Sequence, residues 1–111
     1  MRIWGLKNCD TSRKAMKALE AAGHNIDYVD VRADGVDRAD LERFHAAFGE
    51  ALVNKRSTTW RGLSDDERAG DPIALLAQHP TLMKRPVIED GDQLTLGWDT
   101  KTSDNWLAKA R

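Results

Sequence analysis

The single cysteine of the chain, Cys9, stands where a strand-like segment gives way to a helical pattern. The segment 1–6 is short and mostly apolar, which predicts a buried strand. The segment 11–22 places apolar side chains at helical spacing, which predicts a helix. Cys9 therefore lies at the N-terminus of a predicted helix, where unpaired amides and the helix dipole favour a negative charge such as a thiolate. A lone cysteine is often a small buried hydrophobe. Here the flanking residues 8–12 are otherwise polar, which favours a reactive thiol.

The helix dipole does not ionise a thiol at neutral pH by itself. It contributes about 0.3–1 kcal/mol, and one pKa unit corresponds to about 1.4 kcal/mol. Additional positive charge is therefore needed beside Cys9. Arg13 follows one helical turn later, and helix side chains lean toward the N-terminus, so we expect its guanidinium to lower the Cys9 pKa.

Length, charge and cysteine content limit the class of protein. The 111 residues predict one domain with a core of ordinary size. A formal net charge of −1 gives no reason to expect binding to nucleic acid or to a membrane surface. We find no apolar segment long enough for a signal peptide or a membrane span, and one cysteine cannot form an internal disulfide. These features predict a protein of the reducing cytoplasm.

The middle of the chain predicts a block of helices after a second strand at residues 26–31. Its expected segments are a helix capped by Asp37, a short turn at 51–54, an exposed basic loop at 55–61, a capping box at 64–67 and a helix opened by Asp71-Pro72. Lys55 and Arg56 of the basic loop are either solvated or a second source of positive charge at the site. The three histidines share no metal-ligand spacing, so no metal site is expected.

The C-terminal part predicts a hairpin and a last helix. Residues 87–89 and 93–96 flank Asp90-Gly91-Asp92, which is a hairpin signal, and Ser103 is expected to cap a helix that carries Trp106. Without the helical block, the order strand–helix–strand–hairpin–helix resembles the thioredoxin pattern. Such proteins carry a cis-proline before the hairpin, beside the thiol. The resemblance therefore implies a cis Arg85–Pro86 bond, with Arg85 facing Cys9.

Three stretches together resemble the arsenate reductase (ArsC) family and, within it, the YffB/Spx-like subgroup. They are residues 4–11 (WGLKNCDT), 54–61 (NKRSTTWR) and 84–86 (KRP), while Leu96-Gly97-Trp98 takes the place of a common Leu-Gly-Phe. The resemblance covers nearly the whole chain. It implies a single α/β domain of thioredoxin-like fold, residues 1–111, with a helical insertion at about 34–83 between the second strand and the C-terminal hairpin.

Two departures distinguish branches of this family. Arsenate reductases carry two further anion-binding arginines, and the resemblance aligns Asn54 with the first and places Gly97 near the second. Spx-type regulators, which bind RNA polymerase, often carry a second cysteine three residues after the first. Ser12 occupies that position here.

The resemblance implies a glutathione-dependent thiol reductase with no bound cofactor. Cys9 is the expected nucleophile, and it would act on an unknown thiol or disulfide substrate through a mixed disulfide, with glutathione as co-substrate. The residues expected to lower its pKa and to hold an anionic partner such as a glutathione carboxylate are Arg13, Lys55 and Arg85. The expected supporting residues are Thr11, Ser12 and Pro86. Two alternatives remain open, a regulator that docks on RNA polymerase and a weak arsenate reductase.

Overall fold

The computed structural model of the protein describes residues 1–108, which divide between two compact units. The first unit comprises Met1–Asp30 and the chain from Arg85 onward, and the second comprises Val31–Lys84. The second unit covers the segment for which the sequence predicts a helical insertion, residues 34–83. Each unit has buried apolar side chains of its own.

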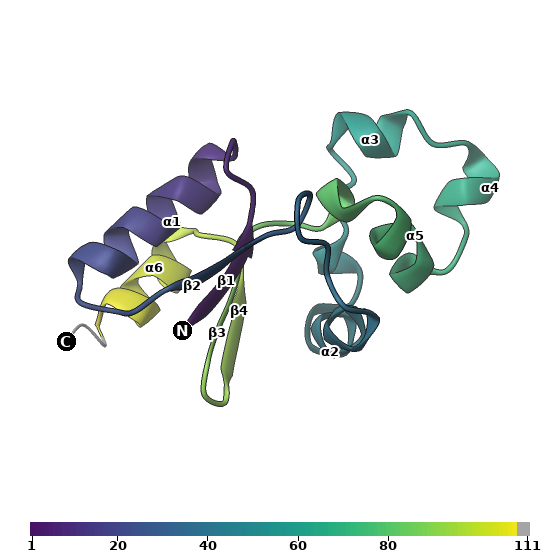
Figure 1. Ribbon diagram of the computed structural model, residues 1–111. Helices are drawn as coiled ribbons and strands as arrows, with labels where there is room; N and C mark the ends of the chain where they lie inside the picture. Colours follow the sequence, from purple (N-terminus) through teal and green to yellow (C-terminus); the bar gives the residue numbers. More distant parts are fainter. Residues whose placement is uncertain (109–111) are drawn as a thin grey trace. The chain divides into compact units, whose positions relative to one another are not determined.

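A four-stranded sheet in the order β2-β1-β3-β4 organises the first unit (Figure 1). Strand β1 (Arg2–Gly5) runs parallel to β2 (Asp27–Asp30) and antiparallel to β3 (Val87–Asp90). Strand β3 pairs antiparallel with β4 (Gln93–Leu96), and Gly91 turns the chain between them with φ of 60°. The predicted hairpin is therefore confirmed, and β1 and β2 form the parallel pair.

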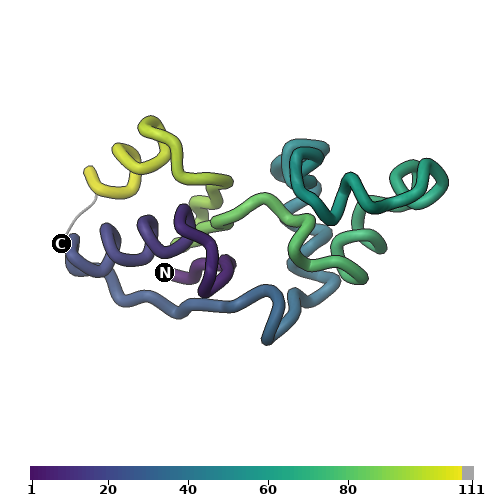
Figure 2. The backbone as a smooth tube through the Cα atoms, turned by 90° about the horizontal axis from the view of Figure 1, so that it is seen from above, coloured from purple at the N-terminus to yellow at the C-terminus, as the bar shows by residue number. Residues whose placement is uncertain are grey.

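Two helices, α1 (Asp10–Ala21) and α6 (Thr100–Leu107), lie side by side against one face of this sheet (Figures 1 and 2). Ile3 and Ile88 are paired across β1 and β3, and both belong to a buried cluster that Leu19 and Trp106 complete from the two helices. Full burial of an aliphatic side chain of this size contributes about 1.5–3 kcal/mol. This packing fixes the start of α1 at the end of β1.

The second unit is helical. Its elements are α2 (Arg38–Phe48), η1 (Gly49–Leu52), α3 (Thr58–Arg61), α4 (Asp65–Arg68), α5 (Pro72–Gln78) and η2 (Pro80–Leu82). Helix α2 packs against η1 and α5. The buried apolar residues of these elements include Leu41, Phe44, Leu52, Leu76 and Leu82.

Two of the predicted helix starts are confirmed with their hydrogen bonds. The Glu67 amide donates to Ser64 Oγ (3.2 Å) and the Ser64 amide donates to Glu67 Oε1 (2.9 Å), which is a complete capping box. The Ile73 amide donates to Asp71 Oδ1 (3.2 Å), with Pro72 at the first helical position. Local sequence therefore determines where α4 and α5 begin.

Two predictions about local structure are wrong. Residues 55–61 are not simply an exposed loop, because Ser57 Oγ accepts from the Trp60 amide (3.1 Å) and caps the short helix α3. Helix α6 is capped by Asp99, whose carboxylate accepts from the Thr102 amide (2.8 Å). Ser103 lies inside that helix and donates to the Thr100 carbonyl (3.1 Å) instead.

Candidate active site

Cys9 is the N-cap residue of α1. Its backbone is extended, with φ of −91° and ψ of 116°, and its carbonyl accepts the Arg13 amide at 3.0 Å. Its own amide donates to the Leu6 carbonyl at 3.2 Å, which closes a tight turn between β1 and α1. The prediction that Cys9 stands at a strand-to-helix junction is therefore confirmed. The thiol is partly exposed at the positive end of a 12-residue helix.

Strand β2 holds this turn at two points. Tyr28 Oη donates to the Leu6 carbonyl (2.9 Å), and Asp30 Oδ2 accepts from the Lys7 amide (3.2 Å). Tyr28 and Asp30 are two residues apart on a strand, so their side chains leave the same face of the sheet. The turn before Cys9 is therefore fixed at the carboxyl ends of the parallel strands, where α/β proteins usually bind their ligands.

Gly5 leaves room for polar side chains behind the turn. A Cβ atom at this position would lie 2.6 Å from Tyr28 Oη and 2.7 Å from Ser12 Oγ, closer than side-chain packing allows. Gly5 is itself buried, at the end of β1. The missing side chain is therefore what lets Ser12 and Tyr28 approach the same point of the backbone.

The surroundings of Cys9 favour its thiolate. Burial raises the pKa of the Cys9 thiol. Hydrogen bonds from the Ser12 side chain and backbone amide, together with a hydrogen bond and the positive charge from Arg85, lower that pKa by more than burial raises it. The net pKa of Cys9 therefore lies below the ordinary value. The Ser12 side chain is fully buried, so water does not compete for its hydroxyl. That hydroxyl is therefore available to a negatively charged sulfur.

Arg85 belongs to the same unit as Cys9 and is half-buried. The Arg85–Pro86 peptide bond is cis, as the resemblance to thioredoxin-like proteins implies. Pro86 is buried at the start of β3, and its carbonyl accepts the amide of Gly97 (2.8 Å). Residues from two distant parts of the chain, Ser12 and Arg85, thus act on one thiol.

The remaining predicted residues of the first unit lie on the exposed start of α1. Arg13 forms an ion pair with Asp10 (Nη2–Oδ1, 2.7 Å), and its side chain is 53% exposed. The groups that lower the Cys9 pKa are Ser12 and Arg85, and Arg13 is not one of them. Thr11 is exposed in the first turn of the helix.

Lys55 lies in the second unit. Its Nζ is 3.9 Å from Glu50 Oε2, and it lines a hollow of about 450 Å³ together with Asn54, Arg56 and Lys84. The backbone N–H of Asn54 donates to the Leu82 carbonyl (2.8 Å), and the backbone N–H of Lys84 donates to the Leu52 carbonyl (2.7 Å). These bonds bring the segment of Lys55 and Arg56 beside the segment of Lys84. We call this surface the basic hollow. Among the described residues 1–108, none of those that line it carries a carboxylate side chain.

Sequence reasoning did not assign a role to Tyr28, Asp30, Gly5 or Lys84. Tyr28 and Asp30 alternate at the end of a predicted strand, which is a signal that they share a face. Their contact with the turn before Cys9 depends on the pairing of β1 with β2, in which Gly5 lies opposite Asp30. Within residues 1–108, no group of three His, Cys, Asp or Glu side chains is placed to hold a metal ion.

Comparison with known proteins identifies the family. The sequence model of the ArsC family matches residues 4–105. An uncharacterized protein of Haemophilus influenzae is 42% identical over 89% of this chain and 91% of its own length. The solved structure of the YFFB (PA3664) protein superimposes with a TM-score of 0.87 at 32% identity, covering 96% of this chain and 97% of that one.

A more distant relative is the global transcriptional regulator Spx 2 of Bacillus cereus, which is 22% identical over 97% of this chain and 87% of its own length. The four-stranded sheet with its helices is the thioredoxin-like fold that this chain shares with the YFFB structure. Both the family match and the YFFB alignment extend across the thiol turn, the helical unit and the hairpin. The chain therefore belongs to the ArsC family.

Proposed function

We propose that this protein is a monothiol reductase that uses the Cys9 thiolate as nucleophile and glutathione as its external thiol. The observation that carries this proposal is the site of Cys9, where a helix N-terminus, Ser12 and Arg85 together lower the pKa of the one thiol in the chain. The thiolate is the reactive form of cysteine, so a lowered pKa increases the reactive fraction at neutral pH.

The reaction has two thiol–disulfide exchange steps. The Cys9 thiolate attacks one sulfur of a substrate disulfide, so that a Cys9 mixed disulfide forms and the other sulfur leaves as a thiolate that takes a proton from water. A glutathione thiolate then attacks the sulfur bonded to Cys9. This step regenerates the Cys9 thiolate and transfers the disulfide to glutathione. The product of this step is a mixed disulfide of glutathione with the substrate sulfur, and a second glutathione thiolate converts it in solution to oxidised glutathione and the free substrate thiol. The two electrons that reduce the substrate therefore come from two glutathione thiols.

An external thiol is required because the chain has no second cysteine. The residue three positions after Cys9 is Ser12, whose hydroxyl does not ionise near neutral pH and cannot resolve a disulfide. Glutathione carries two carboxylates, and we assign their binding beside Cys9 to Arg85 and Arg13, which belong to the same unit as the thiol. Lys55 belongs to the second unit, and its role as an anion-binding residue stays a prediction from the sequence.

A second candidate function is a regulator that docks on RNA polymerase, and the similarity to Spx 2 supports it. The two functions differ in their need for the thiol. Replacing Cys9 by alanine removes the nucleophile and abolishes a reductase, whereas a docking surface would retain its affinity for the polymerase. Binding of the Cys9→Ala protein to RNA polymerase, measured beside its loss of reductase activity, separates the two.

The direct test is formation and release of a glutathione adduct. The protein is treated with oxidised glutathione and its mass is followed, then reduced glutathione is added. We expect one adduct on Cys9 that reduced glutathione removes, and no adduct on a Cys9→Ser control. An unmodified wild-type protein, or an adduct that reduced glutathione leaves in place, would contradict the proposal.

A further inference from the structure

A cavity of about 80 Å³ lies within the second unit, and Cys9 is not among its lining residues. Its apolar walls are Val53, Trp60, Pro72 and Leu75. A cavity needs only about 10–15 Å³ of such volume to hold one water molecule, so this space accommodates a small organic group. An apolar cavity of about 150 Å³ binds benzene, which limits the group here to about three to five carbon atoms.

Two cations accompany the aromatic wall. The Lys55 ammonium and the Arg68 guanidinium both belong to lining residues, and each lies 5.8 Å from the centroid of the Trp60 ring. The ring electrons attract cations at this distance. Trp60 is only partly buried, so its ring is a wall of the cavity and not part of a closed core.

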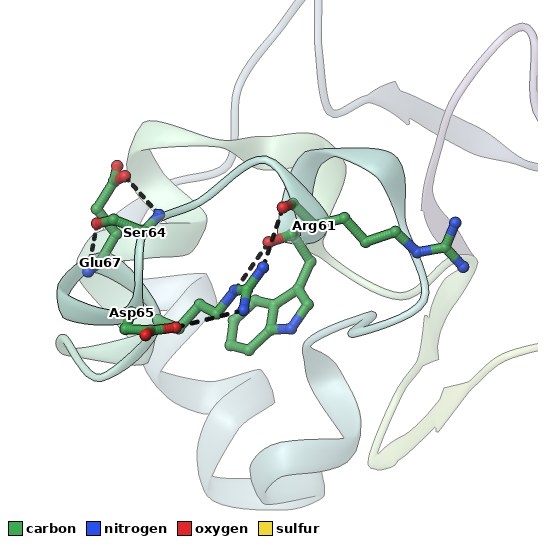
Figure 3. A network of polar contacts seen from close by, with 6 residues as sticks. Arg61, Ser64, Asp65 and Glu67 are labelled. Atoms are coloured by element: carbon green, nitrogen blue, oxygen red, sulfur yellow. Dashed lines mark hydrogen bonds and ion pairs between the residues drawn. The ribbon is translucent and has the colours of Figure 1, made fainter.

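The Arg68 side chain is held in place by backbone carbonyls (Figure 3). Its Nε donates to the Trp60 carbonyl (3.1 Å) and its Nη2 donates to the Arg61 carbonyl (3.0 Å). Its carboxylate partner is Asp65, at 3.6 Å, and that side chain is fully exposed. The guanidinium is thus fixed beside the cavity by bonds that do not neutralise its charge.

The ion pair of Lys55 with Glu50, like that of Arg68 with Asp65, is long and involves an exposed carboxylate. The Lys55 Nζ lies 3.9 Å from Glu50 Oε2, and Glu50 also lines the cavity although its side chain is 90% exposed. Exposed ion pairs contribute only about 0–1 kcal/mol because water screens them. A bound carboxylate that pairs with Lys55 or with Arg68 would therefore replace Glu50 or Asp65 at little cost.

We propose that this cavity binds a small branched aliphatic carboxylate. The aliphatic group packs against Trp60, Pro72 and Leu75, and the carboxylate faces Lys55 and Arg68. The proposal does not require the thiol, because every lining residue belongs to the second unit and none is Cys9. It is therefore tested on the full chain with Cys9 replaced by serine.

The probe is isovalerate, titrated while the indole N–H signal of Trp60 is followed by NMR, with Trp60→Phe used to assign that signal. We expect a saturable shift. Acetate, which lacks the branched group, should bind at least about tenfold more weakly, since each buried methylene contributes about 0.8 kcal/mol. Isoamyl alcohol, which lacks the charge, should bind about fivefold more weakly.

Matched variants locate the binding site. Lys55→Met keeps the aliphatic stem but removes the charge, and should weaken isovalerate binding about fivefold. Arg61→Met is the control, because Arg61 does not line the cavity and its guanidinium points away from the polar network of α3 and α4 (Figure 3). A shift that does not saturate, equal binding of acetate and isovalerate, or an equal loss in the two variants would overturn the proposal.

Discussion

The phenol oxygen of Tyr28 donates a 2.9 Å hydrogen bond to the carbonyl of Leu6, which also accepts the amide of Cys9 at 3.2 Å. One carbonyl thus joins the second strand to the turn that carries the thiol. Burial raises the pKa of Tyr28, so the phenol keeps its proton and donates it throughout the neutral range. The position of Cys9 therefore depends on a residue that is distant in sequence.

Replacing Tyr28 by phenylalanine keeps the ring but removes this hydrogen bond. We expect the free energy of unfolding to fall by about 0.5–1.5 kcal/mol, the usual net contribution of one such bond. We also expect alkylation of Cys9 to slow, because the turn before it loses one of its two attachments to β2. Urea unfolding and iodoacetamide kinetics measure the two effects. Equal stability and equal alkylation rates in both proteins would show that the bond does not position the thiol.

Gly5→Ala tests the crowded space behind the thiol. The added methyl group would lie 2.6 Å from Tyr28 Oη and 2.7 Å from Ser12 Oγ, so one of these groups must move. We expect destabilisation of about 1–3 kcal/mol, as for other overpacked sites. The pKa of Cys9 should rise as Ser12 is displaced.

Gly62→Ala is the matched control. A Cβ at Gly62 would contact only the Thr58 and Thr59 carbonyls, each at 3.6 Å, which is ordinary packing. Its effect on stability and on the Cys9 pKa should be small. If the two alanine variants behave alike, the absence of a side chain at Gly5 is not required for the site.

The elements that the sequence predicts correctly have local signals. The capping box of Ser64 and the hairpin around Gly91 each depend on a few adjacent residues. Helix α3 is only four residues long, so its apolar pattern is too short to distinguish it from a loop. The sequence predicts Ser103 as the cap of α6, whereas Asp99 is the capping residue in the structure. Both residue types are good caps, and the sequence alone does not decide between them.

The site was predictable as far as it depends on chain order. Cys9 follows a strand and opens a helix, and this junction can be read from the spacing of apolar residues. Tyr28 and Asp30 could not be assigned in this way. Their role depends on the parallel register of β1 and β2, which is set by packing between residues more than 20 positions apart.

The pH dependence of Cys9 should show the preference for its thiolate. Because the pKa is lowered in the folded protein, the alkylation rate should reach half its maximum below the ordinary midpoint of a free thiol. Arg85→Met should shift this midpoint upward. Arg13→Met should shift it less, because the Arg13 guanidinium is paired with Asp10. If Arg13→Met shifted the midpoint more than Arg85→Met does, Arg13 would be the main residue that lowers the Cys9 pKa, as the sequence predicts.

The same ionisation contributes to folding stability with a definite sign. A thiol whose pKa is lower in the folded state stabilises that state fully above its unfolded pKa, and the contribution is lost as the pH falls through the folded pKa. Compared with Cys9→Ser, the reduced protein should therefore gain stability as the pH rises through this range. Urea unfolding of both proteins at several pH values measures the difference. A difference that does not change with pH would contradict a lowered pKa.

The last prediction is that this protein reduces arsenate poorly. An arsenylated cysteine needs several hydrogen-bond donors around its oxyanion, and each missing donor costs about 1–3 kcal/mol. By resemblance, arsenate reductases of the family place arginines where this chain has Asn54 and, nearby, Gly97. We expect little glutathione-coupled arsenate turnover by the purified protein. Efficient turnover would show that other donors replace these arginines.

Asn54→Arg alone should not convert the protein into an efficient arsenate reductase. Gly97 is buried and has φ of 84°, a backbone conformation that side chains other than glycine adopt only with strain. Its amide also donates to the Pro86 carbonyl at 2.8 Å, so the backbone there is fixed. An arginine at position 97 would distort the segment next to Arg85. Arsenate turnover should therefore stay low in Asn54→Arg, and Gly97→Arg should lose stability without gaining turnover.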